Sequence, residues 1–195
     1  MDRMSRAVYR LWGSLGEDGR LHASPRFAED LASRYEKGDL ALLETSISKW
    51  SFGQQLEHLY MATHYVLDRL YEAMDAEETA DHPSLWGHAF IAGGYIPRGL
   101  FPTIPQLVPG SGTRAEILPL KESLQVRLGQ LEWNLEQINA SPGRSPHPRM
   151  KHLLARHWLF FLDVHHRHHL RIMRDILKVA RASQRGLTQQ IEGNP

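Results

Sequence analysis

Apolar residues recur every three or four positions in four long stretches of the chain, which is the period of an α-helix that buries one face. These stretches are residues 24–49, 51–74, 113–138 and 150–182. The first is interrupted at Gly38, so we expect either one kinked helix or two short ones there. No stretch alternates with the period of two that is typical of a strand. The pattern therefore predicts an all-α fold, a four-helix bundle with one long connection between the second and third helices.

Two of the predicted helices begin with a sequence signal for an N-terminal cap. Ser51 is followed three residues later by Gln54, and Thr113 is followed three residues later by Glu116. This is the spacing of a capping box, in which each side chain binds the backbone N–H of the other residue. Pro119 comes soon after the second box and could shift the start of that helix.

The connection between the second and third helices, residues 75–112, is rich in both apolar residues and helix breakers. Its second half, FIAGGYIPRGLFPTIPQLVPGSG, contains four prolines and five glycines. We expect the connection to pack over the domain, with a short helix at residues 85–92. Residues 1–23 are expected to form an N-terminal arm, and residues 1–195 a single domain.

Composition and charge exclude several classes of protein. The chain is 42% hydrophobic and 23% charged, as a globular domain is, and its net charge of +1 favours neither nucleic acid nor a membrane as a partner. No stretch reaches the roughly 18 apolar residues of a spanning helix, and the N-terminus lacks the apolar core of a signal peptide, so we expect a cytoplasmic protein. The chain has no cysteine, so any metal must be bound through nitrogen or oxygen.

Histidine is the residue type that departs from the ordinary. Five of the 12 histidines fall within thirteen residues of the fourth predicted helix: His157, His165, His166, His168 and His169. His165 and His169 are four residues apart and continue the apolar stripe, so both rings lie on one face and can reach a single ion. Two buried imidazoles without partners are costly, and a metal removes much of that cost. Four histidines in five positions also fit a solvated basic patch, which the spacing alone does not exclude.

A catalytic metal needs a third ligand from another part of the chain. His58 and His64 on the second predicted helix are candidates, and so is His147 before the fourth, and the periodicity does not choose among them. His166 points away from the apolar stripe, so we expect it at the solvent or at an interface. His168 lies on the flank of the stripe, where it could support a ligand or pack in the core.

Three segments carry a resemblance to a known family. They are WSFGQQLEHL, FIAGGYIPRGLFPTIPQLVPG and HPRMKHLLARHWLFFLDVHHRHHLRIMRDI. Together they resemble the DinB superfamily of metal-binding four-helix bundles, over residues 25–180, and the second is similar to the Ile-Pro-Arg-Gly region of one DinB-like branch. The resemblance implies a divalent metal bound by one histidine of the second helix and a His-x-x-x-His pair of the fourth. These positions are His58, His165 and His169, although the neighbouring histidines also permit another register.

The resemblance further implies a metal-dependent enzyme. Members of the superfamily include thiol-dependent S-transferases and a thiol-dependent isomerase, so we expect a small-molecule substrate and, as cosubstrate, a low-molecular-weight thiol; hydrolysis is another possible reaction. Imidazole ligands suit Zn, Ni, Fe or Cu, so the sequence leaves the metal open. The alternative is a helical bundle that binds a metal or a small ligand without catalysis.

Two charged residues lie beside the candidate ligands. Glu57 precedes His58 and either orients a ligand or faces solvent, and we expect solvent. Asp163 falls off the histidine face of its helix and is expected to be a surface charge. Arg98, in the connection, either binds an anionic group of a substrate or forms a structural ion pair.

Large apolar residues outside the helical stripes indicate self-association. Trp12, Trp133 and Phe160 are examples. Apolar side chains left on a surface often mark an interface between subunits, so we expect a homodimer.

Overall fold

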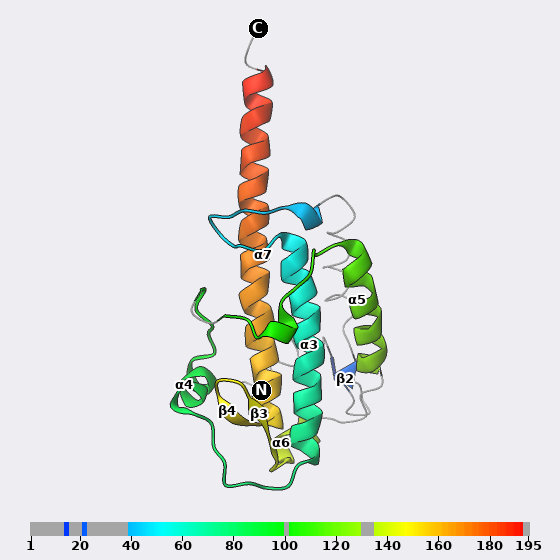
Figure 1. Cartoon of the computed structure of the whole chain (residues 1–195), viewed down its shortest axis with the longest axis vertical. Helices are drawn as coiled ribbons and strands as arrows, with labels where there is room; N and C mark the ends of the chain where they lie inside the picture. The colour runs from blue at the N-terminus through cyan, green and yellow to red at the C-terminus, as the bar shows by residue number, and fades with distance from the viewer. Residues whose placement is uncertain (1–13, 16–20, 23–38, 100–101, 130–134, 193–195) are drawn as a thin grey trace.

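The computed structural model describes residues 14–15, 21–22, 39–99, 102–129 and 135–192 of the chain (Figure 1). The described part is mostly helical, as the sequence predicted. Its α-helices are α3 (Phe52–Asp75), α4 (Leu85–Gly93), α5 (Arg114–Gly129), α6 (Leu135–Ala140) and α7 (Ala155–Glu192). Its 3-10 helices are η1 (Asp39–Ala41) and η2 (Pro105–Leu107). Two antiparallel hairpins pair β1 (Ser14–Leu15) with β2 (Leu21–His22) and β3 (Arg144–His147) with β4 (Lys151–Leu154).

Both predicted capping boxes are present. The backbone N–H of Gln54 donates to Oγ of Ser51 at 3.2 Å, and the backbone N–H of Ser51 donates to Oε1 of Gln54 at 3.0 Å. Thr113 and Glu116 form the same pair of bonds at the start of α5, at 2.9 and 3.4 Å. Pro119 lies inside α5 and does not shift its start.

The core lies between α3 and α7, which run antiparallel side by side, with α5 packed against α3 (Figure 1). Leu59 and Leu67 of α3 and Trp158 and Leu162 of α7 are among the side chains that are fully buried. Burying a side chain of this size contributes about 1.5–3 kcal/mol. The two helices that carry most of the histidines are therefore the most firmly held elements of the described fold. None of the described helices has the length and apolar character needed to cross a membrane.

The hairpin β3–β4 contradicts the prediction that the chain has no strands. The last helix begins at Ala155, five residues later than predicted, and the hairpin occupies the preceding residues. Contacts with α3 hold the hairpin: Oγ of Ser145 donates to the carbonyl oxygen of Arg69 at 2.5 Å, and a Cβ on Gly143 would lie 2.2 Å from the carbonyl oxygen of Ala76. These partners are distant in sequence, so the residues of the hairpin do not reveal them. The strands are also only four residues long, which is too short for a clear alternation of apolar and polar residues.

The first predicted helix is described only from residue 39 onward, and residues 24–38 lie outside the described residues. The expectation of a helix is wrong for residues 42–49, which contain turns. Side chains bind the backbone there: Glu44 accepts from the N–H of Ser46 at 3.3 Å, and Ser48 Oγ accepts from the N–H of Trp50 at 2.9 Å. Such local bonds compete with helical hydrogen bonds.

The seam predicted for the third helix is described in two parts, α5 and α6, and residues 130–134 between them lie outside the described residues. Phe160 does not offer an exposed surface, because it is only 3% exposed and packs 5.9 Å from the ring of Phe90. Trp12 and Trp133 also lie outside the described residues. The homodimer stays a prediction without the support that Phe160 was expected to give.

Candidate metal centre

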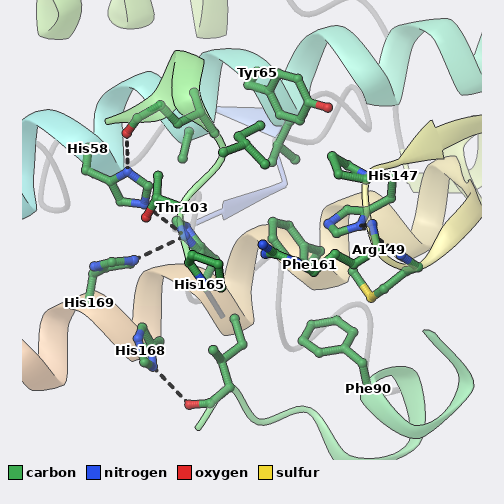
Figure 2. A pocket seen from close by; sticks show the side chains of 18 of the residues that line it. His58, Tyr65, Phe90, Thr103, His147, Arg149, Phe161, His165, His168 and His169 are labelled. Atoms are coloured by element: carbon green, nitrogen blue, oxygen red, sulfur yellow. Dashed lines mark hydrogen bonds between the residues drawn. The ribbon is translucent and has the colours of Figure 1, made fainter. Parts of the chain in front are cut away.

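Three histidine side chains from two helices meet at one point of the structure (Figure 2). His58 comes from α3, and His165 and His169 come from α7. Nε2 of His165 lies 3.3 Å from Nε2 of His58 and 3.1 Å from Nε2 of His169. All three side chains are buried and offer ring nitrogens within 4.8 Å of one another, so the cluster could hold a metal ion.

Hydrogen bonds fix which ring nitrogen carries the proton in two of these histidines. Nδ1 of His58 lies 2.7 Å from the carbonyl oxygen of Leu107, and Nδ1 of His169 lies 2.6 Å from Oε1 of Gln55. The amide of Gln55 is itself oriented, because its Nε2 donates to Oγ of Ser48 at 2.8 Å. Both acceptors are oxygens without a proton, so each Nδ1 is the donor. The two neutral rings therefore present Nε2 lone pairs to the third histidine.

This arrangement fits the donor set of a divalent metal. Nε2 of His165 carries at most one proton, which cannot fully satisfy both lone pairs that face it, whereas a cation accepts the lone pairs of all three rings. Tetrahedral coordination with metal–nitrogen distances of about 2.0–2.1 Å separates the ligand nitrogens by about 3.3 Å. The two Nε2 separations at His165 are close to that value. Nδ1 of His165 is buried and has no hydrogen-bonding partner among the described residues. No hydrogen bond at Nδ1 therefore decides which nitrogen of the His165 ring carries the proton.

Burial keeps the three imidazoles neutral. Desolvation lowers the pKa of His58, and it holds the pKa of both His165 and His169 well below the ordinary value. Neighbouring rings lower the pKa of His165 and His169 further, because a charge on one ring repels a charge on the next. Neutral imidazole is the form that binds metals, so at neutral pH no ring has to become deprotonated before an ion can bind.

No protein-family model, curated protein or solved structure matches the chain. The resemblance to the DinB superfamily thus rests on the three sequence segments that carry it. The chemistry of the site follows from its own residues.

Two other candidate histidines bind elsewhere. Nε2 of His64 lies 3.1 Å from the carbonyl oxygen of Leu120, away from the cluster. His166 is buried, so the expectation that it faces solvent or an interface is wrong. Its Nε2 lies 2.8 Å from Oγ1 of Thr63, which is on α3, because α7 packs against α3 on this side as well.

His168 and His147 both line the space beside the cluster without joining it. Nδ1 of His168 lies 2.9 Å from the carbonyl oxygen of Ile96 and is therefore the donor, which leaves Nε2 as an acceptor. The His168 ring packs edge-on against His169 at 4.9 Å. His147 lies at the end of β3, and its Nδ1 accepts backbone N–H bonds.

Glu57 is buried, in contrast to the expected solvent exposure. Its carboxylate accepts the backbone N–H of Gly110 and of Gly112, each at 3.0 Å. These bonds fix the loop after η2 against α3, and η2 ends with Leu107, whose carbonyl oxygen binds His58. Glu57 therefore supports a candidate ligand indirectly, through the backbone of this loop.

Ion pairs account for the other charged residues near the histidines. Asp163 is 1% exposed and pairs with Arg167 at 3.0 Å, so the prediction that it is a surface charge is wrong. Arg98 pairs with Asp175 at 2.6 Å on the surface. Of the two roles expected for Arg98, a structural ion pair or a contact with an anionic substrate, the structure shows the ion pair.

A cavity of about 810 Å³ opens beside the three histidines, all of which line it. Most of the other side chains around it are apolar or aromatic. Trp86, Phe90 and Tyr95 of the connection between α3 and α5 contribute to its wall, and Phe101 lies outside the described residues. No carboxylate is found among the described residues that line it. The arrangement suits a small, largely apolar ligand that reaches the histidine cluster from one side.

Proposed function

We propose that the chain is a metal-dependent enzyme of the DinB-like, four-helix-bundle type that binds one divalent metal through Nε2 of His58, His165 and His169. The observation that carries the proposal is the convergence of three buried, neutral imidazole nitrogens at the wall of an 810 Å³ cavity. Three protein ligands with open space beside them are typical of catalytic metal sites, whereas structural sites are usually closed by four.

The donor set determines what the site favours. None of the three histidines carries a negative charge, so a divalent ion would keep its full charge and would act as a Lewis acid that lowers the pKa of a coordinated thiol or water. The apolar cavity wall limits the access of water and strengthens electrostatic interactions at this point. His168 leaves Nε2 as an acceptor and lines the same cavity, so it can accept a hydrogen bond from a bound substrate, although burial lowers its pKa and makes it a weak base.

A low-molecular-weight thiol is the cosubstrate that we propose: its thiolate would form a bond from sulfur to an electrophilic carbon, and the thiol proton would pass to solvent or to the group that leaves. Hydrolysis is the second candidate reaction. The chain has no cysteine, which is compatible with a sulfur nucleophile that arrives with the cosubstrate. The competing proposal is a bundle that binds a metal or small ligand without catalysis. It requires the same three ligands but predicts no thiol-dependent turnover.

Metal content tests the ligand assignment. Protein purified without a His-tag and loaded with zinc is expected to retain about one ion per chain after dialysis, measured by elemental analysis. Replacing His165 and His169 together by Ala should abolish retention, and His64→Ala should leave it unchanged because His64 binds Leu120 instead. Circular dichroism confirms that each variant is folded. Equal zinc content in the native protein and the folded double variant would overturn the assignment.

Activity separates the enzyme from the binding protein. Zinc-loaded protein is incubated with a panel of low-molecular-weight thiols and electrophiles, beside His58→Ala and the matched control His64→Ala. The enzyme predicts turnover that is lost in His58→Ala and kept in His64→Ala. Equal background rates in all three proteins, for every thiol, would favour the non-catalytic alternative.

A further inference from the structure

The cavity has a second polar point at the end that lies away from the metal-ligand cluster. His147 and His165 both line the cavity, and Figure 2 shows Phe161 between them. The Phe161 ring stacks on His165 with centroids 5.4 Å apart and meets the His147 ring edge-on at 5.1 Å. A ligand that extends along this aromatic wall from the cluster reaches His147.

The turn between β3 and β4 fixes the tautomer of His147. Nδ1 of His147 accepts the backbone N–H of Arg149 and of Met150, each at 3.1 Å. Because Nδ1 is an acceptor for both, the proton of the neutral ring is on Nε2. Among the described residues, this Nε2–H has no hydrogen-bonding partner.

The surroundings keep this ring uncharged. Burial, together with the positive charge of Arg149, lowers the pKa of His147 to about 4, so the ring is a neutral donor at physiological pH. Trp158 packs 5.2 Å from the same ring, and aromatic and aliphatic side chains form most of the cavity wall. His147 is half-buried and lines the cavity, so an acceptor oxygen of a ligand can bind this N–H in place of water.

We infer that the Nε2–H of His147 binds an acceptor oxygen of the substrate, which is therefore a largely apolar molecule carrying a carbonyl or similar oxygen at the end away from the three histidines. The inference deepens the proposed function and rests on it for the reacting end of the substrate. The absence of any carboxylate among the described lining residues agrees with a ligand that offers acceptors and no positive charge. His147 is in this account a positioning residue for specificity, and it takes no part in bond formation.

Two probes of equal shape test this contact without using the metal. 2-Acetylnaphthalene carries the acceptor oxygen, and 2-isopropylnaphthalene replaces that oxygen with a methyl group. Their dissociation constants are measured by calorimetry on the native protein and on His147→Asn, each in metal-free and zinc-loaded form. Asparagine keeps an oxygen that can accept the turn N–H bonds, and its shorter side chain has no donor at the position of Nε2. His152→Asn, in the same hairpin but not part of the cavity wall, is the matched control.

The ratio of the two dissociation constants is the readout, because it cancels the different hydrophobicity of the probes. His147→Asn should weaken the ketone about three- to tenfold relative to its isostere, the size expected for one hydrogen bond, and His152→Asn should leave the ratio unchanged. His147→Phe, which keeps an aromatic ring at this position, should give the same loss. An unchanged ratio in both His147 variants, or no binding of the ketone to the native protein, would overturn the inference. Since the metal-free protein is included, a failure of zinc binding would count against the proposed function alone.

Discussion

The candidate ligands depend on acceptor groups that hold their second ring nitrogens. Gln55 is the clearest case, because its amide joins Ser48 on one side to Nδ1 of His169 on the other. This bond fixes the ring orientation and raises the electron density at the Nε2 that would bind a metal. The amide is buried, so water cannot easily replace it.

Replacing Gln55 with Leu should therefore lower the zinc affinity of the protein about 10–100-fold, the usual effect of losing a group that orients a ligand. Competition with a chelator of known affinity measures it. Gln137→Leu, on the exposed surface of α6, is the control and should have no effect. An unchanged affinity in Gln55→Leu would show that His169 is oriented by packing alone.

At this scale, the sequence predicted ligands but not the residues that support them. His165 and His169 could be found because a spacing of four is a local property of one helix, and His58 was chosen by resemblance. Glu57 was expected in solvent, yet it binds N–H groups more than fifty residues away. Neighbouring residues carry no information about such partners, so burial of Glu57 and of His166 could not be predicted.

At the scale of the elements, the backbone of the loop after η2 lies directly against the first turn of α3, and a glycine on each side permits this close contact. A Cβ on Gly112 would lie 2.3 Å from the backbone nitrogen of Gln54, and a Cβ on Gly53 would lie 2.1 Å from the carbonyl oxygen of Gly112. Gly112 also has a φ of 69°, which disfavours other residues. This close approach positions the loop from which Leu107 binds His58.

Gly112→Ala should lower the free energy of unfolding by about 1–3 kcal/mol and should also weaken zinc binding, because the loop must move away from α3. Urea unfolding and chelator competition measure the two effects. Gly93→Ala is the matched control, since no atom lies within 4 Å of the point that its Cβ would occupy and its φ is not positive. A Gly112→Ala protein with native zinc affinity would show that the loop does not position His58.

Helix starts were the most predictable feature of the elements. Ser51 with Gln54, and Thr113 with Glu116, make their bonds within one turn, so the sequence contains the whole signal. The β3–β4 hairpin was missed for the opposite reason. Its partners are α3, which binds Ser145, and Pro83, which pairs with Lys151 of β4. Both partners are more than sixty residues away in the sequence.

At the scale of the molecule, buried histidines make stability depend on pH. Burial and neighbouring positive charges lower the pKa of both His147 and His157 to about 4, whereas in the unfolded chain both titrate near 6.5. Between these values the unfolded chain binds protons that the folded chain does not. The free energy of unfolding therefore has its full value, as far as these two groups are concerned, above pH 6.5, and it decreases as the pH falls toward 4.

The urea midpoint of the metal-free protein should accordingly decrease between pH 7 and pH 4.5. In this range the free energy of unfolding falls by up to about 1.4 kcal/mol per pH unit for each proton that only the unfolded chain binds. His157→Gln removes one such group and should make the dependence shallower. A midpoint that is constant over this range would mean that both rings are charged without cost in the folded protein.

The attachment of α4 has a consequence for how the molecule opens. The backbone N–H of Ser84 donates to the carbonyl oxygen of Met150 at 2.9 Å, its hydroxyl donates to that of Arg149 at 3.1 Å, and Gly87 packs directly on Met150, while Leu85 is 88% exposed. The hairpin turn thus supports the N-terminus of α4, while Phe90, farther along the helix, packs on Phe160 and Phe161 of α7. Regions with few buried contacts open first and do so in cooperative units. Because the hairpin turn and the N-terminus of α4 share these bonds, we expect them to open together, and the part of the cavity wall that they form would then reach solvent while α3 and α7 hold the three histidines.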